Sequence, residues 1–200
     1  MSVFATNTWP ELFYGNNSSF TAVANTTSET SLLGGVNLQP TIAPPCFAAV
    51  PGASARCLTV KGWGLLGTTT GPPTINFKFY LSTSIGTTVP GTVTIGSTGP
   101  ITTVASVSNM LWKFELDILC RAPGQGTGNA TLFVSGLVTS PGGFASPTIY
   151  PITPGGGNSA TITAAVDGSI VQYLNVSATW SAANASNTVT LAALPTIAWN

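Results

Sequence analysis

Short runs in which apolar and polar residues alternate are the feature that most limits how this chain can fold. In the clearest run, LWKFELDILCR at residues 111–121, an apolar residue occupies every second position. The charged residues lie between them: Lys113, Glu115, Asp117 and Arg121. A period of two is typical of a β-strand with one buried face, and no segment sustains the 3.6-residue period of a helix. The sequence therefore predicts an all-β fold.

Further runs of this kind follow one another along the chain, with Gly- and Pro-rich turn signals between them. They cover residues 57–66, 74–81, 92–96, 101–107, 130–138, 159–166, 169–180 and 187–199. Short strands at this spacing predict a β-sandwich or barrel, and their count and order favour a single jelly-roll β-sandwich over residues 26–200. Residues 111–121 and 169–180 are the expected interior strands. A loop or an edge strand is expected over 39–53, a loop over 141–158, and core positions for Trp63, Trp112 and Trp180.

Residues 1–25 differ from the rest of the chain, because aromatic and polar residues are mixed there without a period. We interpret this stretch as an extended N-terminal arm. Trp9, Phe13 and Tyr14 need a surface to lie against, and docking on a neighbouring subunit is the favoured interpretation. The alternative is that they pack back onto their own sandwich.

The scarcity of charge limits the possible partners. Only 5% of the 200 residues are charged and the formal net charge is zero, so a monomer has little protection against association. We therefore expect other subunits to cover much of the surface. Nucleic acid is not expected as a partner, because phosphate binding needs clustered Lys and Arg. No run of about 18 apolar residues predicts a membrane-spanning helix, and the first residues lack the pattern of a secretory signal.

Catalytic and metal-binding chemistry has few candidate residues. The sequence contains no histidine, which is the commonest general base and metal ligand. Cys46, Cys57 and Cys120 fit no zinc-binding spacing, and we expect three reduced thiols. The alternative is a Cys46–Cys57 disulfide. No cofactor and no metal are expected.

The charged face of 111–121 allows three interpretations. Glu115 and Asp117 point to the same side of a strand at roughly 6–7 Å, a separation that overlaps that of glycosidase carboxylates. Lys113 and Arg121 on the same side would keep both carboxylates ionised, which disfavours a general acid. The favoured interpretation is an intermolecular contact in which these four residues set register and orientation. A solvated sheet face is the third possibility.

Several motifs occur in an order found in one group of viral proteins. They are NTTSETSLLG, GWGLLGTTTGPPTINFKFYL, LWKFELDILCRAPGQGTGNATLFVSG and LNVSATWSAANASNTVTLAAL. The series, over about residues 26–199, resembles jelly-roll virion proteins of tailed bacteriophages, including capsid decoration (cement) proteins and the heads of fibres or spikes.

The resemblance implies a homotrimeric structural protein without enzymatic activity. The favoured expectation is a decoration protein, made in the host bacterial cytoplasm, that binds the major capsid protein on the capsid exterior. The alternative is a receptor-binding head of a tail fibre or spike, which would touch a host-surface glycan through exposed loops such as 141–158. A carbohydrate-active jelly-roll enzyme is a third, disfavoured alternative.

Overall fold

The computed structural model describes residues 20, 22–33, 39–42, 57–84, 93–122, 130–154, 161–164, 166–167, 170–193 and 195–199. These residues form strands and connecting segments, and none of them lies in a helix. The strands are β1 (Val23–Ala24), β2 (Thr30–Ser31), β3 (Thr41–Ile42), β4 (Cys57–Gly67), β5 (Thr74–Ser82), β6 (Val93–Ser97), β7 (Ile101–Thr102), β8 (Met110–Ala122), β9 (Ala130–Thr139), β10 (Ile149–Pro154), β11 (Thr161–Ala164), β12 (Gln172–Trp180), β13 (Thr188–Leu191) and β14 (Thr196–Trp199). The prediction of an all-β fold is confirmed.

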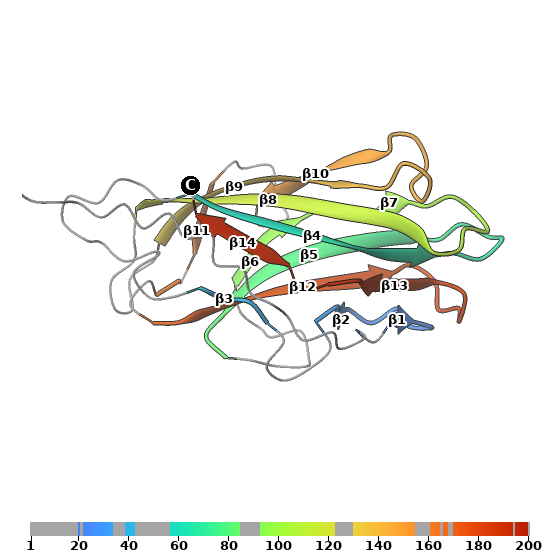
Figure 1. Ribbon diagram of the computed structural model, residues 1–200, viewed down its shortest axis with the longest axis horizontal. Helices are drawn as coiled ribbons and strands as arrows, with labels where there is room; N and C mark the ends of the chain where they lie inside the picture. The colour runs from blue at the N-terminus through green and yellow to red at the C-terminus, as the bar shows by residue number, and fades with distance from the viewer. Residues whose placement is uncertain are drawn as a thin grey trace, which may run out of the picture.

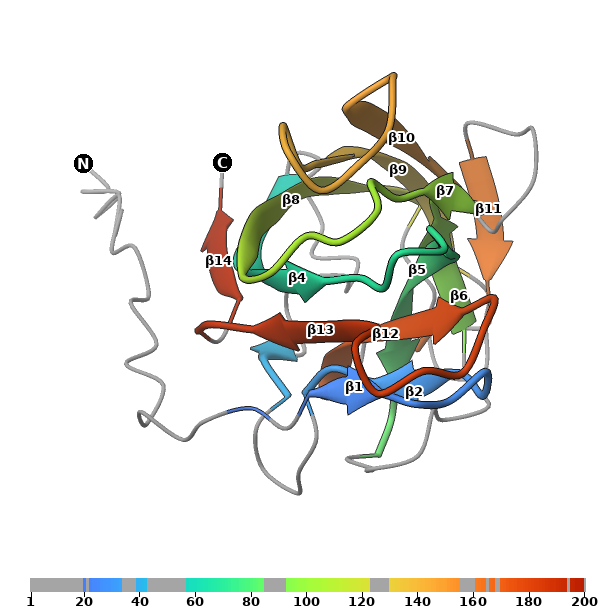
Figure 2. The same cartoon turned by 90° about the vertical axis from the view of Figure 1, so that its right-hand side faces the viewer.

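The strands form one hydrogen-bonded sheet that folds into two layers and nearly closes on itself as a barrel-like sandwich (Figure 1). The order is β1-β13-β4-β8-β9-β10-β6-β5-β12-β2, with β14, β11, β7 and β3 attached to β4, β9, β5 and β12. Figure 2 shows these strands arranged as a ring around the core. The two layers meet at β10, because Ile149–Ile152 pair with β9 whereas Thr153 and Pro154 pair with β6.

The two ends of this order come from the start of the described chain. In β1, Val23 pairs with Val189 of β13, and in β2, Ser31 pairs with Ser177 of β12. The indole Nε1 of Trp180 also donates a hydrogen bond to the carbonyl oxygen of Val23, at 3.2 Å. Val23, which the sequence assigns to the arm, therefore contributes to the sandwich.

The inward faces of β5 and β8 meet in an aromatic core. Phe77 stacks on Trp112 with 4.6 Å between ring centroids, and Phe79 contacts Phe114 at 5.1 Å. The inward residues of β8 are buried as predicted: Trp112, Phe114, Leu116, Ile118 and Cys120. Ring contacts at these distances add to the stabilisation that burial of large apolar surfaces gives.

Glycines in β4 make room for the large rings of β8. A Cβ atom on Gly62 would lie 2.3 Å from Cε1 of Phe114, and one on Gly64 would lie 2.8 Å from Nε1 of Trp112. Since Gly62 and Gly64 face inward, Trp63 faces outward, and 49% of it is exposed. The prediction of a core position is therefore wrong for Trp63, whereas Trp112 and Trp180 are buried.

Proline accounts for two departures from the expected strands. Strand β10 lies within the expected loop 141–158, although it contains Pro151 and Pro154. Proline cannot donate a ladder hydrogen bond, and β10 tolerates it where the strand passes from one layer to the other. The expected strand 187–199 divides into β13 and β14, with Pro195 between them. A third departure does not involve a proline within the strand: the expected strand 101–107 is reduced to β7, Ile101–Thr102.

Candidate functional site

The charged face of β8 points outward, as its alternation predicts. Lys113, Glu115 and Arg121 are exposed, and Asp117 is half-buried. Strand β8 lies between β4 and β9, so the side chains of three neighbouring strands share this surface. What these four residues contact on the adjacent strands decides what chemistry they can perform.

Glu115 forms an ion pair across the β4–β8 ladder. It lies opposite Lys61, whose Nζ is 2.8 Å from Oε1 of Glu115, and just over half of each side chain is exposed. Exposed pairs of this kind contribute at most about 1 kcal/mol. Sequence reasoning expected Lys113 and Arg121 to balance the carboxylates and missed Lys61. The alternation of 57–66 places Lys61 outward, but the pairing of β4 with β8 was not predicted.

Asp117 also binds β4. The hydroxyl of Thr59, its partner in the ladder, donates a hydrogen bond of 2.6 Å to Oδ1 of Asp117. Glu115 and Asp117 thus each interact with a different residue of β4. A glycosidase needs both carboxylates to face one substrate bond or water between them. This arrangement disfavours such a site.

The two basic residues of β8 differ in their surroundings. The guanidinium of Arg121 lies 6.0 Å from the ring centroid of Phe133 on β9, at the limit of a cation–π contact. Lys113 lies between Trp63 of β4 and Thr139 of β9 in the strand register. Among the described residues, Lys113 has no ion-pair partner.

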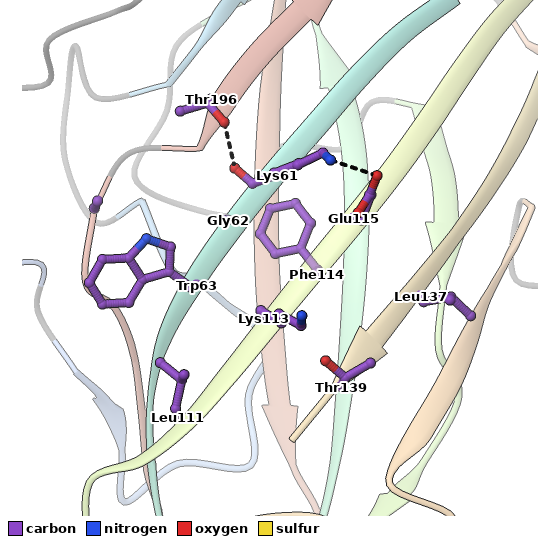
Figure 3. A pocket seen from close by; sticks show the side chains of 11 residues that line it. Lys61, Gly62, Trp63, Leu111, Lys113, Phe114, Glu115, Leu137, Thr139 and Thr196 are labelled. Atoms are coloured by element: carbon purple, nitrogen blue, oxygen red, sulfur yellow. Dashed lines mark hydrogen bonds and ion pairs between the residues drawn. The ribbon is translucent and has the colours of Figure 1, made fainter. Parts of the chain in front are cut away.

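A hollow of about 750 Å³, which we call the outer groove, lies on this face of the sheet (Figure 3). Residues from β4, β8, β9, β14 and the segment before β14 line it: Lys61, Gly62, Trp63, Leu111, Lys113, Phe114, Glu115, Leu137, Thr139, Ala193 and Thr196. Trp63, Leu111 and Leu137 are each about half-exposed, at 49%, 50% and 48%. Exposed apolar side chains that lie together in this way are typical of an interaction surface.

The outer groove brings together Lys113 and Glu115 of the predicted interface residues, and places Asp117 and Arg121 further along β8. Trp9, Phe13 and Tyr14 lie outside the described residues. Sequence reasoning missed the apolar part of the groove. The signal was present in GWG at residues 62–64, since strict alternation from Leu58 and Val60 places both glycines inward and Trp63 outward.

A second charged cluster surrounds Glu29, just before β2. Its carboxylate accepts hydrogen bonds from Nζ of Lys78 at 2.8 Å, from Oγ of Ser177 at 2.6 Å and from the hydroxyl of Tyr80. Burial opposes ionisation, but these donors outweigh it, and the pKa of Glu29 lies below its ordinary value of 4.5. The hydrogen bond to Glu29 raises the pKa of Lys78, and burial followed by that bond raises the pKa of Tyr80. These hydrogen bonds connect the segment before β2 to strands β5 and β12.

The thiols on described residues are poorly suited to nucleophilic chemistry. Cys57 and Cys120 are free. Burial and the neighbouring Asp117 raise the pKa of Cys57, and burial raises the pKa of Cys120. A raised pKa reduces the thiolate fraction that reacts. Cys46 lies outside the described residues.

Within the described part of the chain, no three His, Cys, Asp or Glu side chains lie close enough together to hold a metal ion. No helix with the length and apolarity needed to cross a membrane occurs in that part either. Comparison of the chain with models of protein families, with curated proteins and with solved structures finds no significant match.

Proposed function

We propose that this chain is a structural virion protein of a tailed bacteriophage that acts by binding and has no catalytic activity. In the favoured form it is a homotrimeric capsid decoration protein. It is made in the host bacterial cytoplasm, binds the major capsid protein on the capsid exterior, and helps the shell to resist the pressure of packaged DNA. The motif resemblance supports the viral context, and three features of the fold support the mode of action.

The first feature is the pairing pattern, which supports a jelly roll. Eight strands matter here, in chain order: β1, β2, β4, β5, β6, β8, β12 and β13. The first pairs with the eighth, the second with the seventh, the third with the sixth and the fourth with the fifth. This is the pattern of a long hairpin rolled up on itself, as in the jelly rolls of viral capsid and lectin domains. Strands β9, β10 and β11 would then be an insertion.

The second feature, which carries the proposal, is the exposed apolar surface around Trp63, Leu111 and Leu137. Large aromatic and aliphatic side chains that lie exposed together on a surface are typical of a protein–protein interface. In a chain with only ten charged residues, five of each sign, little repulsion opposes such a contact.

The third feature is the engagement of Glu115 and Asp117 with Lys61 and Thr59 on β4. The two carboxylates of a glycosidase must both face the same substrate bond, whereas Glu115 and Asp117 each bind a different residue of β4. The arrangement supports a positioning role for the charged face and disfavours the carbohydrate-active enzyme.

The test is the number of copies per particle. Quantitative mass spectrometry of purified particles should find this protein in hundreds of copies, and native mass spectrometry of the isolated protein should find a trimer. Absence from the particles would refute the virion assignment. A handful of copies would refute decoration and favour the tail alternative.

One observation favours that alternative, a receptor-binding head. The connection from β9 to β10, residues 140–148, projects at one end of the molecule (Figure 1). Loops at the ends of a sandwich commonly carry binding sites. A glycan array would show binding for a receptor-binding head, and shortening this loop should abolish that binding.

A further inference from the structure

Lys113 lies in the outer groove with apolar side chains on both sides. Trp63 lies opposite Lys113 across the β4–β8 ladder, and Leu137 of β9 lies opposite the neighbouring Glu115. Both apolar side chains are about half-exposed, at 49% and 48%. Figure 3 shows Lys113 between Trp63 and Leu137, so the groove presents an apolar, a cationic and a second apolar group in succession.

The charge of Lys113 is available to a ligand. Glu115, the carboxylate nearest to it on β8, is already held by Lys61 at 2.8 Å. Lys113 itself has no ion-pair partner among the described residues. A ligand that matches the groove should therefore carry one carboxylate between two apolar groups.

The chain itself contains a segment with this order. In WPELFY, residues 9–14, Trp9, Glu11 and Phe13 occupy every second position, and Glu11 is the only charged side chain of residues 1–19. In an extended segment, residues two positions apart point to the same side at roughly 6–7 Å. Such a segment presents an apolar, an anionic and a second apolar group, which is the complement of the groove.

We propose that residues 9–14 of one copy bind in the outer groove of a second copy, with Glu11 at Lys113 and the two aromatic rings against Trp63 and Leu137. The inference rests on the self-association proposed above and names the contact that produces it. Because the proposed functional unit is an oligomer, we assign the segment to a neighbouring copy and not to the groove of its own chain.

The decisive experiment mixes two full-length variants. Trp9→Ser/Phe13→Ser lacks the two aromatic side chains assigned to the contact but keeps the groove, and Leu137→Arg blocks the groove but keeps the segment. Each alone should associate at least about a hundredfold more weakly than the parent chain, because large apolar anchors dominate such contacts. Mixed together, they should form a complex that contains both variants, detected by analytical ultracentrifugation and native mass spectrometry. Val104→Arg is the matched control, since Val104 is 37% exposed but does not line the groove.

A charge exchange tests the pairing of Glu11 with Lys113 without altering any apolar group. Glu11→Lys and Lys113→Glu should each weaken association about fivefold to tenfold, as expected for an ion pair at an interface. The double variant should recover most of the parent affinity. A double variant that associates as weakly as either single variant would overturn the assignment of this pair.

The other outcomes separate the two proposals. Normal oligomers of the Trp9→Ser/Phe13→Ser variant would overturn this inference while self-association stands. A parent chain that stays monomeric at all concentrations would refute self-association and this contact together. Crosslinking of residue 11 to residue 113 within a single copy would show that the segment binds its own groove, which would also overturn the inference.

Discussion

Gly64 of β4 lies opposite Trp112 of β8, and the indole ring occupies the space into which a side chain at Gly64 would project. The indole Nε1 donates a hydrogen bond of 3.2 Å to the carbonyl oxygen of Thr190 on β13. A Cβ atom on Gly64 would lie 1.8 Å from that same oxygen. The packing of β4, β8 and β13 against one another therefore requires a residue without a side chain at Gly64.

Gly64→Ala should destabilise the protein by about 2–3 kcal/mol, because the backbone of β13 and the Trp112 ring would both have to move. Urea denaturation monitored by tryptophan fluorescence measures this. Gly71→Ala is the control, since a Cβ atom there meets no atom within 4 Å and should change stability by less than about 0.5 kcal/mol. Equal effects of the two substitutions would contradict the packing argument.

Glu29→Gln should lower the free energy of unfolding at pH 7 by about 1–2 kcal/mol, since it removes the charge that Lys78, Ser177 and Tyr80 stabilise. Glu115→Gln, which removes only an exposed ion pair, should cost less than about 1 kcal/mol. Chemical denaturation of both variants and the parent chain tests the difference.

The effect of Glu29 should depend on pH with a defined sign. Its pKa is lower in the folded state than the ordinary value of 4.5, so its contribution is complete above pH 4.5 and is lost as the pH falls through the folded pKa. The difference in stability between the parent chain and Glu29→Gln should therefore be constant from pH 6 to 7 and shrink below about pH 4.5. A difference that grew on acidification would contradict this assignment.

Lys61 and Glu115 should show only weak coupling. A double-mutant cycle with Lys61→Met and Glu115→Gln should give an interaction free energy below about 1 kcal/mol, and added salt should reduce it. A coupling of several kcal/mol would mean that the pair is buried in an assembled form of the protein.

Reducing agent should not change the melting temperature, because we expect unpaired thiols and Cys57 is free. Scanning calorimetry with and without reductant measures this. A decrease of about ten degrees in reductant, the order expected for loss of a disulfide, would instead indicate the Cys46–Cys57 bond.

The alternation of apolar residues was sufficient to predict the all-β fold and the buried face of β8. It also contained the orientation of Trp63, which was misassigned because a tryptophan was expected to be buried. The two glycines beside Trp63 are the correct signal, since an inward glycine opposite an inward aromatic ring supplies the volume that the ring needs. The expectation that a tryptophan is buried gave the wrong orientation for Trp63, whereas the period of two gives the correct one.

The groove and its ion pair were beyond prediction from the sequence, because they depend on which strands become neighbours. Lys61 and Glu115 are far apart in the chain, and Leu137 joins them only because β9 pairs with β8. Strand β10 was missed for a related reason. Its two prolines argue against a central strand, and only its position between the two layers makes them tolerable.

The pairing of β1 with β13 and of β2 with β12 has a consequence for biosynthesis. A ribosome releases Val23 and Ser31 well before it adds Val189 and Ser177, their ladder partners. Until then, β4 and β5 also lack the neighbours β13 and β12. A nascent chain with such long-range pairings folds slowly and exposes unpaired strand edges meanwhile. A nascent chain stalled on the ribosome before residue 172 should therefore bind chaperones. A chain that is elongated beyond residue 191 and released from the ribosome should no longer bind them.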